Sequence, residues 1–343
     1  MEKVSKISNR KNEHLTICLE KNVESNVSAG FNNISIIHQA LPELDFNQID
    51  TRTTFLGKSL NAPLLISSMT GGSKESARYN IIFAEIANHF QIAMGVGSQR
   101  AAIEDSNLED TFKVRKVAPN ILLFANIGAV QLNYGYGVAE VIKAIDMIEA
   151  DAVFLHLNPL QEALQAEGNT NFTGLLRKIE RICKSIETPV FIKEVGCGIN
   201  AQTARLLFDS GVRGIDCAGL GGTSWALVEA ERHSDQRMAT LAREFGNWGI
   251  PTVSCLLDYR KYNFSKHIIA SGGIRTGMDI FKSIALGAHL AGMALPFLKA
   301  ASQGVEALNV FIENIIEELI ITMFNAKTAT IADIDISTIH IEE

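Results

Sequence analysis

The amino-acid sequence predicts an α/β protein built as a (β/α)8 barrel, and three observations support this prediction. From Pro63 onward, short runs of apolar and β-branched residues alternate with longer amphipathic stretches, as in βα units around a parallel sheet. Eight such runs are present, which is the number of strands in a TIM barrel. Small and polar residues follow every run, at the end where barrel enzymes carry their active sites.

The eight runs are predicted strands because each is short, apolar and bounded by turn residues. They lie at residues 63–67, 92–95, 121–125, 152–157, 189–194, 214–218, 267–271 and 288–293. Helical periodicity fills the intervals, for example in Lys74–Phe90 and in residues 173–186. The long apolar run 305–324 is predicted to be the last barrel helix, partly buried against a neighbouring subunit.

The first 60 residues contain no clear βα unit. We therefore expect residues 1–60 to form an N-terminal arm and cap, and residues 61–343 to form the barrel, in one domain overall. Although 343 residues would allow two or three ordinary domains, α/β barrels commonly use about 250 or more residues as one.

Composition and charge exclude several functions. With 47% hydrophobic and 20% charged residues, the chain can bury a large core and differs from disordered proteins. The net charge of −7, without a long basic run, offers no surface for nucleic acid or an anionic membrane. No stretch reaches the roughly 18 apolar residues of a membrane span, and the charged N-terminus lacks the apolar segment of a signal peptide. We expect a cytoplasmic protein.

The cysteines are predicted to be reduced thiols, because their number is odd, none forms a C-x-x-C pair and they sit in apolar runs. They are Cys18, Cys183, Cys197, Cys217 and Cys255.

Glycines after the seventh and eighth predicted strands predict a phosphate site. Gly272 and Gly273 let the backbone approach a ligand, and Arg275 adds a charged fork of donors. Thr276 is predicted to cap the helix at residues 277–286 and to leave its first N–H groups facing an anion. A second glycine set at residues 219–222 would complete the cradle. The alternative for each set is an ordinary glycine turn.

Lys193 closes an apolar strand, so its side chain is predicted to point into the barrel mouth, where a buried amine needs a negative partner. The anionic N1–C2=O edge of a reduced flavin would supply that partner. The alternative is a lysine that extends from the rim to water and pairs with Glu194.

The segment at residues 156–162 carries four polar side chains just after the fourth strand. Glu162 is a candidate Mg²⁺ ligand, with water and substrate phosphates as the other ligands, and the alternative is a solvated surface carboxylate. His156 and Gln161 are candidates to position a substrate or move a proton, and the alternative is turn hydrogen bonding.

Arg10, Lys11 and His14 place three donors on one helical face, which suits a diphosphate. The alternative is a solvated basic turn.

Taken together, these residues resemble the type 2 isopentenyl-diphosphate isomerases, which are flavin-dependent barrels of the FMN oxidoreductase group. The likeness spans nearly the whole chain. Its motifs are Arg10-Lys11-Asn12-Glu13-His14-Leu15, Ser68-Met69-Thr70-Gly71-Gly72, Gly97-Ser98-Gln99-Arg100, His156-Leu157-Asn158-Pro159-Leu160-Gln161-Glu162, Gly221-Gly222-Thr223-Ser224-Trp225-Ala226 and Ser271-Gly272-Gly273-Ile274-Arg275.

The resemblance implies a role for individual residues. FMN would be held by Met69, Thr70, Gly71, Ser98, Asn126, Lys193, Thr223, Gly272, Gly273, Arg275 and Ala294. The substrate diphosphate would meet Arg10, Lys11, His14, Ser98, Arg100, His156 and Gln161. The catalytic residues would be Gln161, His156, Asn158 and Lys193, and Glu162 would bind Mg²⁺.

The implied reaction converts isopentenyl diphosphate to dimethylallyl diphosphate, in the synthesis of isoprenoid precursors. It involves no net redox change, yet it needs FMN reduced by NAD(P)H, and the reduced flavin acts as acid and base. The family commonly forms tetramers or octamers. No G-x-G-x-x-G motif follows any predicted strand, so the choice between NADH and NADPH stays open.

The chain departs from the family pattern at Asn247, where an Asp is usual, which puts a local cap or ion pair in doubt.

The sequence argues against three other functions of a flavin barrel. A 2-hydroxy-acid oxidase needs a His-Gly-x-Arg run after the sixth strand, where this chain has Gly219-Leu220-Gly221-Gly222-Thr223. A dehydrogenase of the inosine-monophosphate type needs a nucleophilic Cys in a loop, whereas Cys217 is predicted inside a strand. A catalytically inactive flavin-binding barrel would not need the polar residues from His156 to Glu162.

Overall fold

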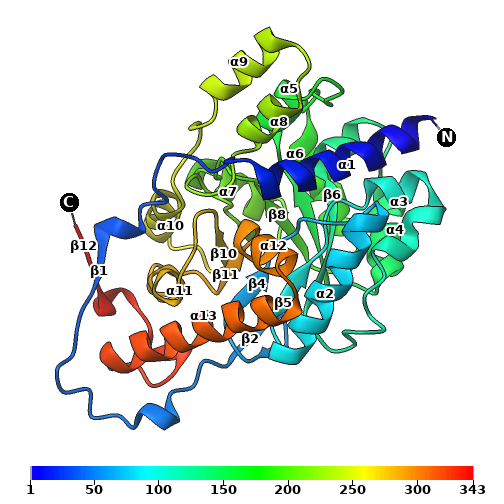
Figure 1. The fold of residues 1–343 in the computed structure, drawn as a ribbon. Helices are drawn as coiled ribbons and strands as arrows, with labels where there is room; N and C mark the ends of the chain where they lie inside the picture. Colours follow the sequence, from blue (N-terminus) through cyan, green and yellow to red (C-terminus); the bar gives the residue numbers. More distant parts are fainter. Residues whose placement is uncertain (1, 343) are drawn as a thin grey trace.

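Eight parallel strands close into a barrel in a computed structural model that describes residues 2–342 (Figure 1). Around the barrel their order is β10-β11-β4-β5-β6-β7-β8-β9. The strands are β4 (Leu64–Ile66), β5 (Ala93–Gly95), β6 (Leu123–Gly128), β7 (Ala152–His156), β8 (Val190–Lys193), β9 (Gly214–Asp216), β10 (His267–Ser271) and β11 (Leu290–Met293). Each overlaps one predicted strand, so the predicted (β/α)8 fold is confirmed.

Most strand bounds differ from the prediction by one or two residues, and two strand ends near the carboxyl rim differ by more or change the place of a candidate residue. Strand β6 continues to Gly128, beyond the predicted end at residue 125, because Asn126 and Gly128 pair in register with Phe154 and His156 of β7. A polar residue can therefore continue a strand when the neighbouring strand extends as far. Strand β9 stops at Asp216, so Cys217 follows this strand directly and does not lie inside it.

The barrel interior is filled by aromatic and aliphatic side chains. The rings of Phe124 and Phe154 are stacked with their centroids 4.4 Å apart, and Phe191 meets Phe124 edge to face at 5.4 Å. A hairpin of β2 (Thr53–Phe55) and β3 (Lys58–Leu60) adds Phe55 to this inner cluster. The barrel is thus a packed core, and ligands can enter only at a rim.

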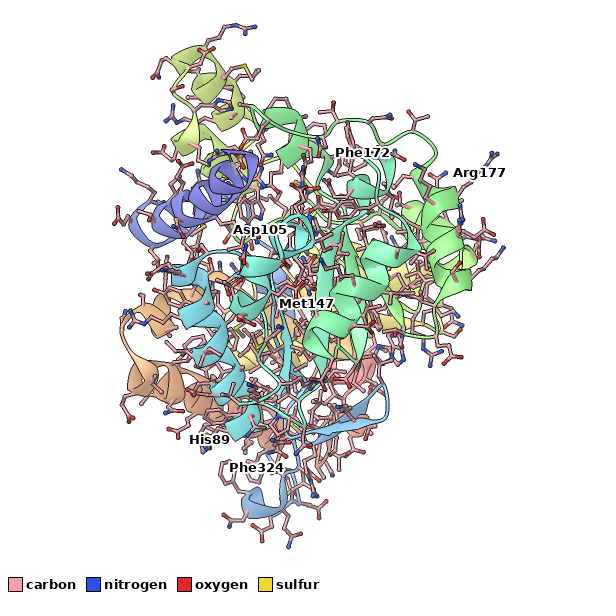
Figure 2. The ribbon with its side chains drawn as sticks, turned by 90° about the vertical axis from the view of Figure 1, so that its right-hand side faces the viewer. His89, Asp105, Met147, Phe172, Arg177 and Phe324 are labelled. Atoms are coloured by element: carbon pink, nitrogen blue, oxygen red, sulfur yellow. The ribbon has the colours of Figure 1, made fainter. Side chains whose placement is uncertain are left out.

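Amphipathic helices surround the strands and bury their apolar stripes against them (Figure 2). Helix α2 has the predicted bounds, and Ser73 caps it by accepting from the N–H of Ser76. In α6, Arg177 projects into solvent, away from the face that buries Ile179 against the barrel. The larger outer helices are α2 (Lys74–Phe90), α4 (Val138–Ile148), α6 (Leu175–Ser185), α7 (Ala201–Asp209), α10 (Thr252–Lys261), α11 (Gly277–Ala285) and α13 (Val305–Asn325).

Shorter helices stand at strand ends and in loops. The α-helices among them are α3 (Arg100–Glu104), α5 (Pro159–Leu164), α8 (Trp225–Arg232), α9 (Gln236–Glu244) and α12 (Leu295–Ser302). The 3-10 helices are η1 (Phe31–Asn33), η2 (Phe46–Gln48), η3 (Ser106–Thr111), η4 (Ala129–Asn133), η5 (Ile331–Asp333) and η6 (Ile336–Thr338). Helix α13 packs on α11 and α12, as expected of the last barrel helix, and its contact with a neighbouring subunit stays a prediction.

The N-terminal residues form a long helix, α1 (Glu2–Glu20), which packs against α8, α12, α2 and α3. The chain then forms β1 (Ile34–Ile36), which pairs antiparallel with β12 (Ile339–Ile341). Segments about 300 residues apart in sequence therefore lie side by side. The division of the chain at residue 60 stays a prediction. Within residues 2–342, no helix combines the length and apolarity needed to cross a membrane.

Candidate active site

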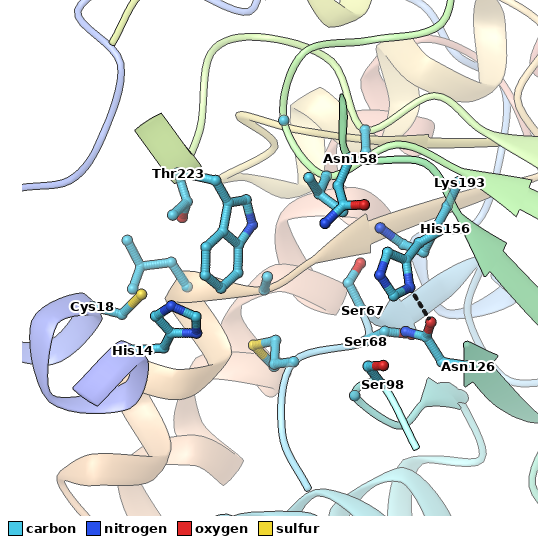
Figure 3. Close-up of a pocket in the computed structure, with 18 of the residues that line it drawn as sticks. His14, Cys18, Ser67, Ser68, Ser98, Asn126, His156, Asn158, Lys193 and Thr223 are labelled. Atoms are coloured by element: carbon cyan, nitrogen blue, oxygen red, sulfur yellow. Dashed lines mark hydrogen bonds between the residues drawn. The ribbon is translucent and has the colours of Figure 1, made fainter. Parts of the chain in front are cut away.

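A pocket opens where the carboxyl ends of all eight barrel strands meet, and α1 forms one wall of it (Figure 3). Every residue predicted to act in binding or catalysis lines this pocket. These residues are Arg10, Lys11, His14, Met69, Thr70, Gly71, Ser98, Arg100, Asn126, His156, Asn158, Gln161, Glu162, Lys193, Thr223, Gly272, Gly273, Arg275 and Ala294. The structure brings them together, and their individual roles stay predictions.

The two predicted glycine loops pack tightly against each other. A Cβ on Gly272 would lie 2.0 Å from the carbonyl oxygen of Gly219, and one on Gly273 would lie 2.6 Å from that of Gly221. Both Gly272 and Gly273 also have positive φ, at 96° and 77°. These glycines are therefore required by the contact between the loops, in addition to any ligand that approaches them.

One part of the predicted phosphate cradle is wrong. Thr276 caps α11 as predicted, since its side chain accepts from the N–H of Asp279 at 3.1 Å. The first N–H groups of the helix do not face an anion site, however. Asp279 accepts from the N–H groups of Arg275 and Thr276, and Glu318 accepts from that of Gly277 at 2.7 Å. Two carboxylates of the chain itself thus occupy this helix terminus.

Arg275 is paired with Glu24, a residue that the sequence did not single out. Glu24 also lies 3.7 Å from Lys299, and it forms an isolated β-bridge with Thr223, which directly follows the glycine set at residues 219–222. The segment after α1 therefore ties both loops together. Glu24 and Arg275 are 251 residues apart, so no local pattern could have revealed the pair.

Lys193 is buried, with 7% of its side chain exposed, so the alternative of a lysine extended to water is wrong. Its amine donates to the backbone carbonyl of Glu194 at 2.5 Å and lies 3.9 Å from a carboxylate oxygen of Asp216. The carboxylate of Glu194 turns away and accepts from the backbone N–H groups of Val195 and Gly196, both at 2.7 Å. Burial raises the pKa of Glu194 to about 7.

His156 is hydrogen-bonded to Asn126, with 2.7 Å between Nδ1 and Oδ1 (Figure 3). The amide nitrogen of Asn126 donates to the carbonyl of Val96 at 3.1 Å, which turns its oxygen toward the imidazole. Nδ1 is then the donor, and Nε2 carries the lone pair. Burial, followed by the charges of Lys193 and Lys11, lowers the pKa of His156 to about 3, so the ring is neutral at physiological pH.

The basic face of α1 turns into the pocket, so the alternative of a solvated turn is wrong. Lys11 Nζ donates to the carbonyls of Gly71 at 2.5 Å and Ser98 at 2.6 Å. Burial lowers the pKa of Lys11 to about 7, and the charge of Arg10 adds to this effect. Arg10 itself lies 3.5 Å from Glu167. The helix is held to the rim through polar contacts that a ligand could share.

Glu229 of α8 is a buried carboxylate that the sequence did not single out. Its Oε1 accepts from His14 at 3.0 Å and from Gln161 at 3.2 Å, while Arg232 contacts Oε2 at 2.7 Å. Burial opposes its charge, but the hydrogen bond from His14 and the nearby cations lower the pKa of Glu229 to about 2. The ring of His14 also packs edge to face on Trp225, at 5.0 Å. Glu229 therefore links His14 of α1 to the side-chain amide of Gln161, a predicted catalytic residue.

Glu162 is buried, with 8% of its surface exposed, so the alternative of a solvated carboxylate is wrong. Its two oxygens accept from Asn158 Nδ2 at 3.1 Å and from the N–H of Asn169 at 2.5 Å. Among the residues that the structure describes, no group of three or more His, Cys, Asp or Glu is arranged for a metal. One carboxylate fits Mg²⁺ nonetheless, because this ion commonly takes most of its ligands from water and phosphate.

Several buried polar atoms in the pocket have no hydrogen-bond partner within the described part of the chain. They are Ser67 Oγ, Ser68 Oγ and Asn158 Oδ1. Buried polar groups are nearly always hydrogen-bonded, so these atoms fit a polar ligand. Room for the two hydroxyls depends on glycine, because a Cβ on Gly292 or Gly95 would lie 2.5 Å from them.

Asn247 acts as a hydrogen-bond acceptor for the segment that follows α1. Its side-chain oxygen accepts from Ser25 Oγ at 2.9 Å and from the N–H of Asn26 at 3.0 Å. No cation contact is needed for this cap, so the departure from the family pattern leaves the local structure intact.

The cysteines do not form a reactive centre. Cys217 is fully buried, and burial raises the pKa of its thiol. Cys18 and Cys255 are also buried, whereas Cys183 and Cys197 are only half-buried. This argues against a cysteine nucleophile beside β9.

Comparison with known proteins agrees with this site. The isopentenyl-diphosphate delta-isomerase of Nostoc sp. strain PCC 7120 is 49% identical over 323 residues, which cover 94% of this chain and 92% of that protein. The enzyme of the same name from Rickettsia canadensis is 47% identical over 325 residues, covering 95% of each chain. The chain belongs to the isopentenyl-diphosphate delta-isomerase family. This isopentenyl-diphosphate delta-isomerase family member also matches the FMN-dependent dehydrogenase family model over residues 142–341.

Solved structures resemble this isopentenyl-diphosphate delta-isomerase family member in fold alone. A flavocytochrome b2 variant with sulfite bound has a TM-score of 0.68 at 16% identity, covering 96% of this chain and 82% of that chain. A putative lactate oxidase from Pediococcus acidilactici has a TM-score of 0.68 at 17% identity, covering 99% of this chain and 94% of that chain. The oxidase function does not follow, because the loop after β9 lacks the histidine and arginine that such chemistry needs.

Proposed function

We propose that this protein converts isopentenyl diphosphate to dimethylallyl diphosphate with FMN and Mg²⁺. The observation that carries the proposal is the position of α1, which brings Arg10, Lys11 and His14 into the pocket formed by the strand ends. A flavin barrel that acted on uncharged substrates would not need these basic side chains. They suit the diphosphate of the substrate that the relatives' name specifies.

FMN would be held by the strand ends and glycine loops, through the cofactor residues named above. The support for this is the set of unpartnered hydroxyls at Ser67 and Ser68 and the buried amine of Lys193, all of which line the same pocket. When bound and reduced, the flavin would supply the proton transfers at the double bond. Lys193 would place a positive charge beside the anionic form of its ring.

The diphosphate would be bound opposite the flavin by Arg10, Lys11, His14 and Arg100. Glu162 would hold Mg²⁺ against its oxygens. A hydrocarbon chain offers the protein no polar handle, so these contacts must fix the position of the reacting carbons. The predicted oligomer, the NAD(P)H reductant and the cytoplasmic location belong to this proposal as well.

Gln161 would lie beside the reacting carbons. Its amide is held at both ends, because Oε1 accepts from Asn158 at 3.0 Å and Nε2 donates to Glu229 at 3.2 Å. A rigid amide of this kind can hold a proton donor or acceptor in place without being ionised itself. His156 is neutral in the free site and can accept a proton through Nε2.

The decisive experiment is an anaerobic assay of the purified protein with isopentenyl diphosphate, Mg²⁺ and pre-reduced FMN. Dimethylallyl diphosphate should form with reduced but not with oxidised cofactor. Mass analysis of the released cofactor should identify FMN and not FAD. The double variant R10A/H14A should bind the flavin but lose isomerisation at low substrate concentration. A reduced, flavin-loaded protein that forms no product would refute the proposed function.

A further inference from the structure

The loop after α5 carries a residue that contacts both the proposed metal ligand and a proposed diphosphate ligand. This loop folds back onto α5 so closely that a Cβ on Gly168 would lie 1.8 Å from the carbonyl oxygen of Glu162. The next residue, Asn169, is thereby placed beside the carboxylate of Glu162. Its backbone N–H donates to Oε2 of Glu162 at 2.5 Å.

The side chain of Asn169 contacts the proposed diphosphate ligand Arg100. Its Oδ1 accepts from Nη1 of Arg100 at 3.1 Å and from Nε2 of Gln131 at 3.1 Å. Gln131 is 3% exposed, so it provides a fixed support for the amide. The other side of the Arg100 guanidinium is held by Glu104, which accepts from Nε at 2.9 Å.

We propose that Asn169 is a positioning residue that fixes the distance between Glu162 and Arg100, so that one Mg²⁺–diphosphate unit can contact both. This inference rests on the proposed function, and it adds a residue that was not among the predicted site residues. An unrestrained arginine side chain loses conformational entropy when it is immobilised. Asn169 and Glu104 already immobilise the Arg100 side chain in the free protein. Less entropy is therefore lost when the ligand binds, which favours binding.

The position of Asn169 predicts which kinetic constant depends on it. Apart from Gln131, which supports its side chain, Asn169 contacts groups that would hold the diphosphate and its Mg²⁺, and these act equally before and during the double-bond shift. Loss of such uniform binding raises KM and leaves kcat nearly unchanged. A defect in the chemistry itself would lower kcat.

The test uses inorganic pyrophosphate with Mg²⁺ as a probe, measured by calorimetry on the FMN-loaded protein. Asn169→Ala keeps the backbone N–H for Glu162 but removes the acceptor for Arg100. Its dissociation constant for the probe should rise roughly tenfold, which corresponds to about 1.4 kcal/mol for a hydrogen bond to a charged group. The KM for isopentenyl diphosphate should rise similarly, with kcat within about twofold. Asn169→Asp retains an acceptor of the same length and should restore the affinity.

Asn171→Ala is the matched control, because Asn171 lies in the same loop but contacts neither Glu162 nor Arg100. Its side chain accepts only from the N–H of Thr173, at 3.1 Å, among the contacts described. This variant should bind the probe like the wild type. If Asn171→Ala weakened binding as much as Asn169→Ala, the effect would be one of loop folding and the positioning role would be wrong. An unchanged affinity and KM in Asn169→Ala would also overturn it. A wild-type protein that bound no pyrophosphate would refute the diphosphate site itself.

Discussion

The amine of Lys193 lies 3.9 Å from the carboxylate of Asp216, and both side chains are buried. The two residues are register partners on the neighbouring strands β8 and β9. The second oxygen of Asp216 accepts from Ser271 Oγ at 2.5 Å, which fixes the carboxylate. Burial raises the pKa of Asp216, against the opposing effects of the Lys193 charge and this hydrogen bond. Asp216 therefore gives Lys193 a partner that belongs to the protein itself.

Lys193→Met should lower the reduction potential of bound FMN, because a cation beside the ring favours the anionic reduced form. A change of tens of millivolts is expected, since about 30 mV corresponds to 1.4 kcal/mol for a two-electron couple. Spectroelectrochemical titration of the loaded protein measures it. Lys184→Met, which removes a solvent-exposed lysine, is the control and should leave the potential unchanged. Equal potentials in wild type and Lys193→Met would refute the electrostatic role.

Diphosphate binding should be accompanied by proton uptake at His156. In the free protein its pKa is about 3, below the ordinary value near 6.5, so the ring is neutral at pH 7 and its Nε2 cannot donate to a phosphate oxygen. A bound dianion raises this pKa and favours the imidazolium. Calorimetry of pyrophosphate binding at pH 7, in buffers of different ionisation enthalpy, reports the protons taken up. His156→Asn should reduce the uptake, and an unchanged value would assign the proton elsewhere.

The same shift predicts how His156 affects stability. Its folded pKa lies below its unfolded pKa, so the unfolded chain binds the proton first as the pH falls. The contribution of a neutral His156 is complete above pH 6.5 and declines as the pH falls toward 3. The difference in melting temperature between wild type and His156→Asn should therefore shrink as the pH falls from 6.5 toward 3.

Glu162→Gln and Gln161→Asn should change different kinetic quantities. The first variant removes an anionic ligand and keeps the shape, so activity should fall and the Mg²⁺ concentration for half-maximal rate should rise. The second should reduce kcat far more than it shifts the Mg²⁺ curve, because its contacts are made beside the reacting carbons. A Mg²⁺ titration of anaerobic isomerisation compares them. Wild-type behaviour of Glu162→Gln would make Glu162 a structural acceptor for Asn158 and Asn169.

Gly272→Ala should destabilise the fold by roughly 3 kcal/mol or more and reduce FMN binding, because the added methyl meets the backbone of Gly219. Gly287→Ala is the matched control. Its φ is also positive, at 100°, but no atom lies within 4 Å of the added Cβ. It should cost only about 1 kcal/mol, for the backbone conformation alone. Thermal unfolding of both variants separates the contact from the conformation, and equal losses would contradict the packing argument.

The strands and the pocket lining could be predicted because both follow from local pattern. A buried parallel strand is a short apolar run, and the residue after it must lie at the catalytic rim. The partners of the predicted cations could not be found in this way. Glu229 lies 215 residues from His14, and on its own it reads as an ordinary helix carboxylate. Asp216 did carry a signal, since an acid within an apolar run requires a buried partner.

The wrong prediction at α11 has a similar cause. The glycine-rich turn and Thr276 indicate a free helix terminus, and the cap itself is present. The carboxylate of Glu318 reaches that terminus from α13, 41 residues further along the chain. Which anion satisfies a helix N-terminus is decided by tertiary packing, which the local sequence does not encode.

The pairing of β1 with β12 constrains how this protein is made. Ile34–Ile36 leaves the ribosome about 300 residues before its partner, Ile339–Ile341. At typical rates of protein synthesis the earlier segment waits on the order of 15 to 60 s for that partner. The flavin barrel can begin to form during this interval, while strand β1, in the segment that follows α1, is not yet paired with β12. The segment that follows α1 is thus among the last parts of the chain to be fixed in place.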